Sequence, residues 1–217
     1  MALKSYFAEL LGTFILVFIG TGSIVTALSI GKGLTVPGIL LIGLTFGFTL
    51  AVIIYALGNI SGAHVNPAVS IAVVIAGKLK ARHLIPYIIM QFIGATLASF
   101  FIVIIVGASF GIGENTIGSF GLLSALVAET VLTALFVIVI LMTAESDYSG
   151  IAIGFFLAVS HLFAIPISGS SLNPARSFGP AIVIGGQALN QLWIYFIGPI
   201  IGAIFGALIF IAFFKSS

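Results

Sequence analysis

The tripeptide Asn-Pro-Ala occurs twice in this chain, as Asn66-Pro67-Ala68 and as Asn173-Pro174-Ala175. Asparagine is favoured at the N-cap of a helix and proline at its first position, so each tripeptide predicts a helix start. We expect these helices at Pro67–Ala76 and Pro174–Ile184, which are too short to cross a bilayer. Each asparagine amide can donate a hydrogen bond to an oxygen atom near the helix tip, where the helix dipole disfavours cations.

Arg176 directly follows the second tripeptide. An arginine within a membrane segment is costly and normally faces a cavity. One interpretation is therefore a pore constriction, in which a fixed positive charge repels cations and the guanidinium N–H groups hold water molecules. The alternative is that Arg176 extends its side chain to the outer interface of the membrane.

The elements that position these residues must lie in lipid. Of the 217 residues, 61% are hydrophobic and 6% are charged, whereas an average soluble domain is roughly 45–50% apolar and about 25% charged. This composition excludes a soluble enzyme and a disordered chain. The net charge of +2 is too small to indicate a nucleic-acid partner, and the absence of cysteine excludes disulfides and thiolate metal sites. We expect no cofactor.

Long apolar runs without alternating polarity predict membrane-spanning helices rather than strands. We place six spans, at Ser5–Ser29, Gly38–Leu57, Leu84–Val106, Phe120–Thr143, Gly150–Ala164 and Gln191–Phe214. The fifth is short, and we expect it to extend through its polar end. Gly113-Glu114-Asn115 marks the outer loop between the third and fourth spans.

The basic residues predict the orientation of these spans. Lys32 falls on one side, and a larger group falls on the other: Lys4, Lys78, Lys80, Arg82 and Lys215. The side with more basic residues is normally cytoplasmic. We therefore expect a multi-pass protein of the cell membrane with both termini in the cytoplasm.

The chain contains two copies of one design. Residues Gly43–Ile71 align with Gly150–Phe178 without a gap, and the matches include polar residues that are scarce in lipid. Each copy has three spans, so the second copy must enter the membrane from the opposite side. We therefore predict an all-α integral membrane fold with six transmembrane helices, two re-entrant half-helices and an inverted 3+3 repeat. Residues 1–217 would form a single domain, with repeats at about 1–107 and 120–217.

Glycines recur at a spacing of four residues in the spans of both repeats. They include the pairs Gly43 and Gly47 in the second span and Gly150 and Gly154 in the fifth. Small residues at this spacing allow helices to cross closely, although membrane helices are rich in glycine in general. The spacing alone does not identify which helices meet.

The paired motifs resemble those of the aquaporin (major intrinsic protein) family. They read Ser-Gly-Ala-His-Val-Asn-Pro-Ala-Val from residue 61 and Ser-Gly-Ser-Ser-Leu-Asn-Pro-Ala-Arg from residue 168, and the similarity extends over nearly the whole chain. The resemblance implies a pore in each protomer and assembly into a homotetramer in the lipid bilayer. It also implies passive, bidirectional conduction of water, with protons and ions excluded at the meeting point of the half-helices.

The same resemblance locates a constriction formed by Phe46, His161, Ser170 and Arg176. This set looks like the filter of the water-selective branch, since the glycerol-conducting branch usually has Trp and Gly at the first two places. That branch also often has Asp where this chain has Ser177. Taken without the resemblance, Phe46 would be a core residue, His161 a packed histidine and Ser170 a turn residue.

Glu9 and Glu129 are matched carboxylates in the first span of each repeat. A carboxylate in a membrane helix needs partners. It could relay protons, or it could brace the re-entrant loops by accepting hydrogen bonds from their backbone N–H groups. We favour the brace, which the resemblance also implies, and we expect His64 to be a structural partner of the same kind.

Three other functions remain open at this point. The first is a channel for small neutral solutes, where Phe46 and His161 argue against glycerol but not against ammonia. The second is an ion-coupled transporter that uses Glu9 and Glu129 as its coupling site. The third is an intramembrane hydrolase, in which a serine of residues 168–171 would need His161 within hydrogen-bond reach. No distinctive hydrolase motif supports this third function, and we expect a protein that is not an enzyme.

Overall fold

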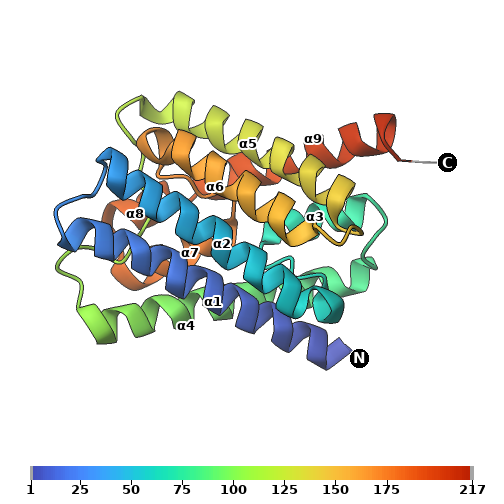
Figure 1. The fold of residues 1–217 in the computed structure, drawn as a ribbon, viewed down its shortest axis with the longest axis horizontal. Coiled ribbons are helices and arrows are strands. Elements are labelled where there is room, and N and C mark those ends of the chain that lie inside the picture. The colour runs from blue at the N-terminus through green and yellow to red at the C-terminus, as the bar shows by residue number, and fades with distance from the viewer. Residues whose placement is uncertain (1, 216–217) are drawn as a thin grey trace.

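The computed structural model describes residues 2–215 and is built from helices packed along one long axis (Figure 1). In chain order the helices are α1 (Ala2–Ser29), α2 (Val36–Ser61), α3 (Pro67–Ile75), α4 (Leu84–Val106), α5 (Gly121–Thr143), α6 (Ser149–Ser168), α7 (Pro174–Ile184), α8 (Gly186–Gln191) and α9 (Ile194–Phe213). A short 3₁₀ turn at Ala81–His83 precedes α4. Six of the described helices are long and apolar enough to cross a membrane, which confirms the predicted fold class.

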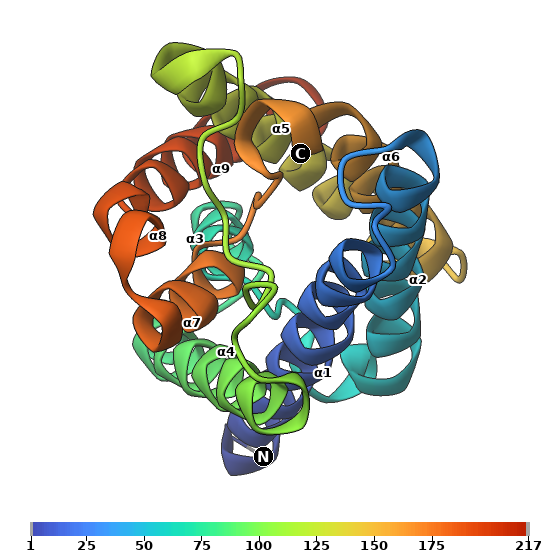
Figure 2. The ribbon, with the colours of Figure 1, turned by 90° about the vertical axis from the view of Figure 1, so that its left-hand side faces the viewer.

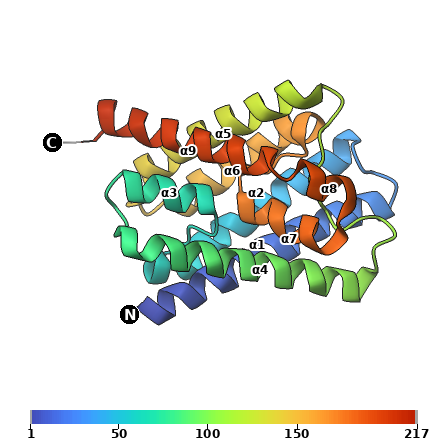
Figure 3. The ribbon, with the colours of Figure 1, turned by 180° about the vertical axis from the view of Figure 1, so that it is seen from behind.

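The long helices surround the middle of the molecule, as the view along the long axis shows (Figure 2). The short helices α3 and α7 follow one another along that axis and pack between α4 and α9 (Figure 3). The two short helices therefore enter from opposite ends of the bundle and point their N-termini at each other. The start of α1 and the end of α9 lie at the same end of the bundle (Figure 3).

The second predicted span ends too early, because helix α2 continues past Leu57 to Ser61. The fifth span extends past Ala164 through its polar end, as expected, and α6 ends at Ser168. Each ends at a glycine in the left-handed region, where an ordinary side chain is disfavoured: Gly62 at φ +87° and Gly169 at φ +72°. The irregular re-entrant backbone of the first repeat is therefore shorter than predicted.

Other boundaries agree with the prediction to within a few residues, apart from one missed helix. Helix α4 and the half-helix α7 have the predicted bounds, α1 begins earlier at Ala2, and α3 ends at Ile75. The segment before the last span contains the short helix α8, which was not predicted. The last span then begins at Ile194 instead of Gln191, because the turn after α8 separates the two helices.

The glycines of the repeats meet where α2 crosses α6. A Cβ atom on Gly47 would lie 2.5 Å from the carbonyl oxygen of Gly154, and a Cβ atom on Gly154 would lie 2.5 Å from that of Gly47. The two backbones are thus in direct contact, and these glycines cannot carry side chains without separating the helices. The same principle applies where α1 meets α4 and where α5 meets α9, at Gly94 and Gly202.

Gly47→Leu is therefore expected to destabilise the protein. The side chain would collide with the backbone of α6, and overpacking of this kind costs roughly 1–3 kcal/mol. Thermal unfolding of the detergent-purified protein measures the effect. Gly22→Leu is the matched control, because a Cβ atom on Gly22 of α1 meets nothing within 4 Å. Equal melting temperatures for the two variants would contradict the crossing.

Candidate functional site

The tips of α3 and α7 touch through their capping asparagines. Asn66 Oδ1 accepts a hydrogen bond from the backbone N–H of Ala68 at 2.9 Å, as an N-cap does. Asn173 Oδ1 accepts from Ala175 N at 3.0 Å in the same way. The amide nitrogens reach across to the opposite half, where Asn66 Nδ2 donates to Leu172 O at 2.8 Å and Asn173 Nδ2 donates to the Val65 carbonyl at 2.9 Å. Each Nδ2 therefore keeps a second hydrogen atom for another acceptor.

The backbone that leads into each tip has an unusual conformation. Ala63 and Val65 have φ angles of +48° and +44°, and the corresponding Ser170 and Leu172 have +50° and +55°. Non-glycine residues seldom adopt this region, and each such residue costs of order 1–3 kcal/mol. The surrounding structure must hold these segments in place.

Glu9 and Glu129 supply much of that hold. The Glu9 carboxylate accepts hydrogen bonds from His64 N at 2.9 Å and Val65 N at 2.7 Å. The Glu129 carboxylate accepts from two backbone N–H groups of the other loop, at residues 171 and 172, with distances of 2.8 and 2.7 Å. Each also accepts from the last serine of a long helix, Ser61 or Ser168, at 2.7 Å. Every one of these partners is a donor, and the carboxylate oxygens are the acceptors.

His64 lies in the same network. Its Nδ1 is 3.1 Å from the hydroxyl oxygen of Ser70, and its ring packs edge-on against Tyr87 with centroids 5.3 Å apart. The hydroxyl group of Tyr87 donates to Ser61 O at 2.9 Å. In the second repeat the hydroxyl group of Tyr195 donates to the carbonyl of residue 168 at 2.8 Å. The two repeats thus hold their re-entrant loops with corresponding contacts.

A cavity of about 630 Å³ leads from one end of the bundle to the helix tips and beyond them. At the open end it is lined by Lys78, Glu145 and Asp147, and it then passes the asparagine caps. Its inner end is lined by Phe46, His161 and Arg176, the residues predicted to form a constriction. The fourth predicted residue, Ser170, is fully buried but does not line this cavity.

The predicted constriction residues pack tightly around the Phe46 ring. The rings of Phe46 and His161 stack with centroids 4.4 Å apart, and Arg176 Cζ lies 5.1 Å from the Phe46 centroid. Each of these three side chains is 1% exposed. A cation over an aromatic face is attracted by the ring, so Phe46 helps to hold the guanidinium in place.

The hydrogen bonds of the constriction leave several polar atoms available. His161 Nδ1 is 3.0 Å from the carbonyl of Leu157, which can only accept, so Nδ1 carries the proton and Nε2 of the neutral ring is an acceptor. Arg176 Nη1 donates to Gly113 O at 2.7 Å. Four further atoms have no partner among residues 2–215, namely His161 Nε2, Ser170 Oγ, Arg176 Nε and Arg176 Nη2. Buried polar atoms without partners are costly unless a polar solute binds them.

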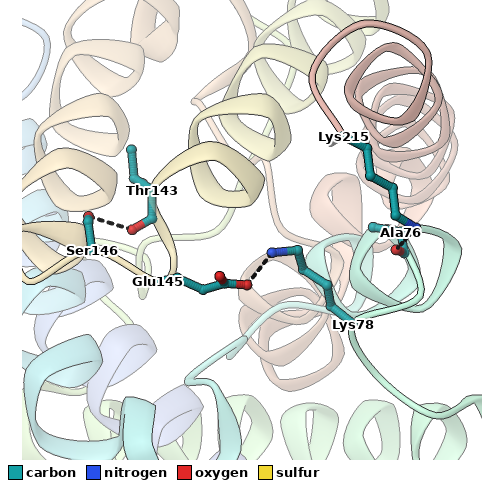
Figure 4. A network of polar contacts seen from close by, with 6 residues as sticks. All are labelled: Ala76, Lys78, Thr143, Glu145, Ser146 and Lys215. Atoms are coloured by element: carbon teal, nitrogen blue, oxygen red, sulfur yellow. Dashed lines mark hydrogen bonds and ion pairs between the residues drawn. The ribbon is translucent and has the colours of Figure 1, made fainter. Parts of the chain in front are cut away.

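The open end of the cavity carries an ion pair (Figure 4). Lys78 Nζ contacts Glu145 Oε1 at 2.5 Å and joins the loop after α3 to the loop between α5 and α6. The hydrogen bond and charge of Lys78 lower the pKa of the exposed Glu145 carboxyl group. Nearby, Lys215 Nζ donates to Ala76 O at 3.1 Å, where a positive charge suits the C-terminus of the half-helix.

Several residues of the site were not identified from the sequence. Gln91, a polar residue within an otherwise apolar span, could have been found by that contrast, and it donates to Glu9 Oε2 at 2.7 Å. Gly113 acts through a backbone carbonyl, which has no signature in sequence. Asn115 was assigned only to the outer loop, yet it is buried and hydrogen-bonded to Gly169 O.

Comparison with known proteins gives a consistent assignment. Residues 1–210 match the family model described as major intrinsic protein. The chain is 44% identical over 221 residues to Aquaporin Z of Photorhabdus laumondii, an alignment that covers 94% of each protein. It is 41% identical over 217 residues to Aquaporin Z of Brucella melitensis, covering 93% of this chain and 94% of the relative.

Other relatives carry different names. The chain is 42% identical over 214 residues to Glycerol uptake facilitator protein-like 6 of Lactiplantibacillus plantarum, covering 94% of this chain and 95% of the relative. The solved structure of the aquaglyceroporin from Plasmodium falciparum superposes with a TM-score of 0.86 at 21% identity, covering 97% of this chain and 96% of that one. At that identity the superposition demonstrates a shared fold alone. The family match over residues 1–210 and the identities above 40% establish that this chain belongs to the major intrinsic protein family, the aquaporin family of multi-pass membrane channels, whose members are not enzymes.

Proposed function

We propose that this protein is a passive, bidirectional channel selective for water. The observation that carries the proposal is the set of unpaired polar atoms at the constriction, His161 Nε2 and two nitrogens of Arg176, which lie at the end of a continuous cavity. One acceptor and two donors suit a water molecule, which both donates and accepts hydrogen bonds. A molecule that entered here would replace its lost hydration with these contacts.

The asparagine caps support the exclusion of protons and ions. Asn66 and Asn173 both line the cavity, and each keeps one amide hydrogen for an oxygen atom of a passing molecule. Two helix N-termini, each equivalent to roughly half a positive charge, meet at this point and disfavour cations. Arg176 adds a full positive charge further along the path. In this proposal the asparagines orient neutral molecules, while cations are repelled first at the helix tips and again at Arg176.

The size of the constriction supports water over glycerol. Phe46 and His161 stack on one another, and Gly20 lies so close behind the Phe46 ring that a Cβ atom there would collide with it. The Phe46 side chain therefore cannot move back to admit a solute with a carbon chain. The names of the relatives include both Aquaporin Z and a glycerol facilitator-like protein, so a channel for glycerol or ammonia is the second candidate.

We further propose a homotetramer in the cell membrane, with both termini in the cytoplasm and residues 1–217 forming one domain. The orientation is supported by the basic residues that follow α3 and α9, because Lys78 lines the open end of the cavity and Lys215 bonds to Ala76 nearby (Figure 4). Protease accessibility of tags at the two ends of the chain, in sealed vesicles of known orientation, tests the topology.

The selectivity is tested by stopped-flow light scattering on vesicles that contain the purified protein. We expect osmotic water flux well above that of protein-free vesicles at several pH values, with no increase in glycerol flux. Ammonia flux is measured in the same preparation from the change of internal pH. Water flux no faster than in empty lipid would overturn the proposal, and equal acceleration of glycerol would favour the second candidate.

A further inference from the structure

The two half-helices are anchored through corresponding serines that have different partners. Ser70 and Ser177 occupy matching positions, and each lies one turn inside its half-helix. Ser70 Oγ accepts a hydrogen bond from Gln91 Nε2 of α4 at 2.9 Å. Ser177 Oγ donates instead to Asn115 Oδ1 at 2.8 Å, and Asn115 belongs to the loop that joins the two repeats.

The difference follows from the sequence of the repeats. The motif Ile93-Gly94-Ala95 matches Ile201-Gly202-Ala203, which places Pro199 of α9 where the first repeat has Gln91. Proline carries no side-chain amide, so α9 cannot anchor the second half-helix in this way. The amide comes from the connecting loop, and the anchor of the second half-helix is therefore attached to a loop rather than to a helix.

Asn115 joins this loop to the constriction on two sides. It is 2% exposed, and its Nδ2 donates to Gly169 O at 3.0 Å, directly before Ser170. Its Oδ1 holds Ser177, directly after Arg176. One buried amide thus links the end of α6 and the start of α7, which both carry constriction residues.

Asn115 also lies two residues from the carbonyl that holds Arg176. Gly113 O accepts from Arg176 Nη1, and this is the one hydrogen bond that the guanidinium makes within residues 2–215. Gly113 has φ +80°, and a Cβ atom on it would lie 2.6 Å from the Cβ atom of Thr21 in α1. Two residues span at most about 7 Å, so a shift at Asn115 reaches Gly113 directly.

We propose that Asn115 is a positioning residue of the constriction. By fixing the connecting loop against α6 and α7, it places the Gly113 carbonyl where it holds the Arg176 guanidinium, and it thereby sets which neutral solutes pass. This inference rests on the proposed role of Arg176 in selectivity. Asn115 contacts no solute in this proposal and acts only through Arg176.

The test is a double-mutant cycle on vesicles, with urea and water fluxes measured for the wild type, Asn115→Ala, Arg176→Ala and the double variant. We expect Asn115→Ala to raise the urea-to-water ratio roughly fivefold, the factor that corresponds to the loss of about one hydrogen bond. The double variant should leak no more than Arg176→Ala alone, because both changes release the same group. Asn190→Ala, an exposed asparagine of α8, is the control and should match the wild type.

Each outcome separates this inference from the proposed function. If Arg176→Ala leaks urea and Asn115→Ala does not, the role of Asn115 is wrong and the proposed function stands. If the effects of the two changes multiply in the double variant, Asn115 acts independently of Arg176 and the inference is also wrong. If Arg176→Ala does not leak, the proposed constriction itself fails.

A purely structural role for Asn115 would lower stability without changing selectivity. If Asn115→Ala does not yield folded protein, Ser177→Ala decides the question, because it removes the same hydrogen bond from the other side. A raised urea-to-water ratio in folded Ser177→Ala supports the inference, and an unchanged ratio overturns it.

Discussion

Arg176→Ala is expected to admit small cations and urea while water continues to pass. The guanidinium is buried against Phe46 and held by Gly113 O, so its removal both widens the constriction and removes a fixed positive charge. A cation that passes about 6 Å from the guanidinium is repelled by about 3 kcal/mol at an effective dielectric constant of about 20, which corresponds to roughly 100-fold in rate. Vesicle assays of urea flux and of cation conductance measure the two effects.

Arg176→Lys separates charge from shape. Lysine keeps the positive charge but lacks the planar fork that reaches Gly113 O. We expect this variant to exclude cations almost as well as the wild type and to leak urea to an intermediate extent. Arg82→Ala, which removes an exposed arginine, is the control for the loss of a positive charge elsewhere in the protein. Cation conductance of Arg176→Ala no higher than that of Arg82→Ala would contradict the role assigned to Arg176.

Glu129→Gln is expected to destabilise the protein strongly, although glutamate and glutamine side chains have nearly the same shape. The carboxylate accepts hydrogen bonds from Ser168 Oγ and from the backbone N–H groups of Ser171 and Leu172. An amide offers one oxygen acceptor and turns its NH₂ group toward donors, so at least one buried donor loses its partner. An unsatisfied buried donor costs roughly 1–3 kcal/mol, and the left-handed backbone at Leu172 would lose its restraint as well. We therefore expect the free energy of unfolding to fall by about 3 kcal/mol.

Thermal unfolding in detergent and the yield of folded protein measure this loss. Glu145→Gln makes the same chemical change at an exposed carboxylate and is the matched control. Glu9→Gln should resemble Glu129→Gln, since Glu9 holds the first re-entrant loop through the same kinds of donors. If Glu129→Gln melted at the same temperature as Glu145→Gln, the carboxylate would not be bracing the loop.

The half-helices show which helix boundaries can be predicted from local sequence. Asparagine and proline determine a helix start within a few residues, and both short helices begin at the predicted proline. The C-terminal ends of α2 and α6 were harder to predict. The second span was expected to end at Leu57, but the helix continues through Gly58, because helices tolerate an internal glycine, and it ends only where Gly62 adopts a left-handed conformation.

The constriction could be predicted in part. The resemblance to the aquaporin family predicted four residues, and the structure brings three of them together, namely Phe46, His161 and Arg176, whereas Ser170 does not line the cavity. The carbonyl of Gly113 and the amide of Asn115 were not identified, because they lie 63 and 62 positions away from the groups that they bind on α7. A connecting loop without periodic structure offers no pattern from which such contacts can be inferred.

The membrane class, the six spans, the repeat and the capped half-helices follow from the amino-acid sequence, because they depend on apolar run length and on local backbone preferences. Which polar atoms are satisfied, and which remain available to a solute, depends on how the helices and loops pack together. Asn66 donates one amide hydrogen to Leu172 O, and Arg176 donates one N–H group to Gly113 O. The partners are 106 and 63 positions apart in the sequence, so local backbone preferences cannot predict these contacts. In lipid, polar groups must find their hydrogen-bond partners within the protein. The donors available to a solute are therefore those that have no partner in the folded structure.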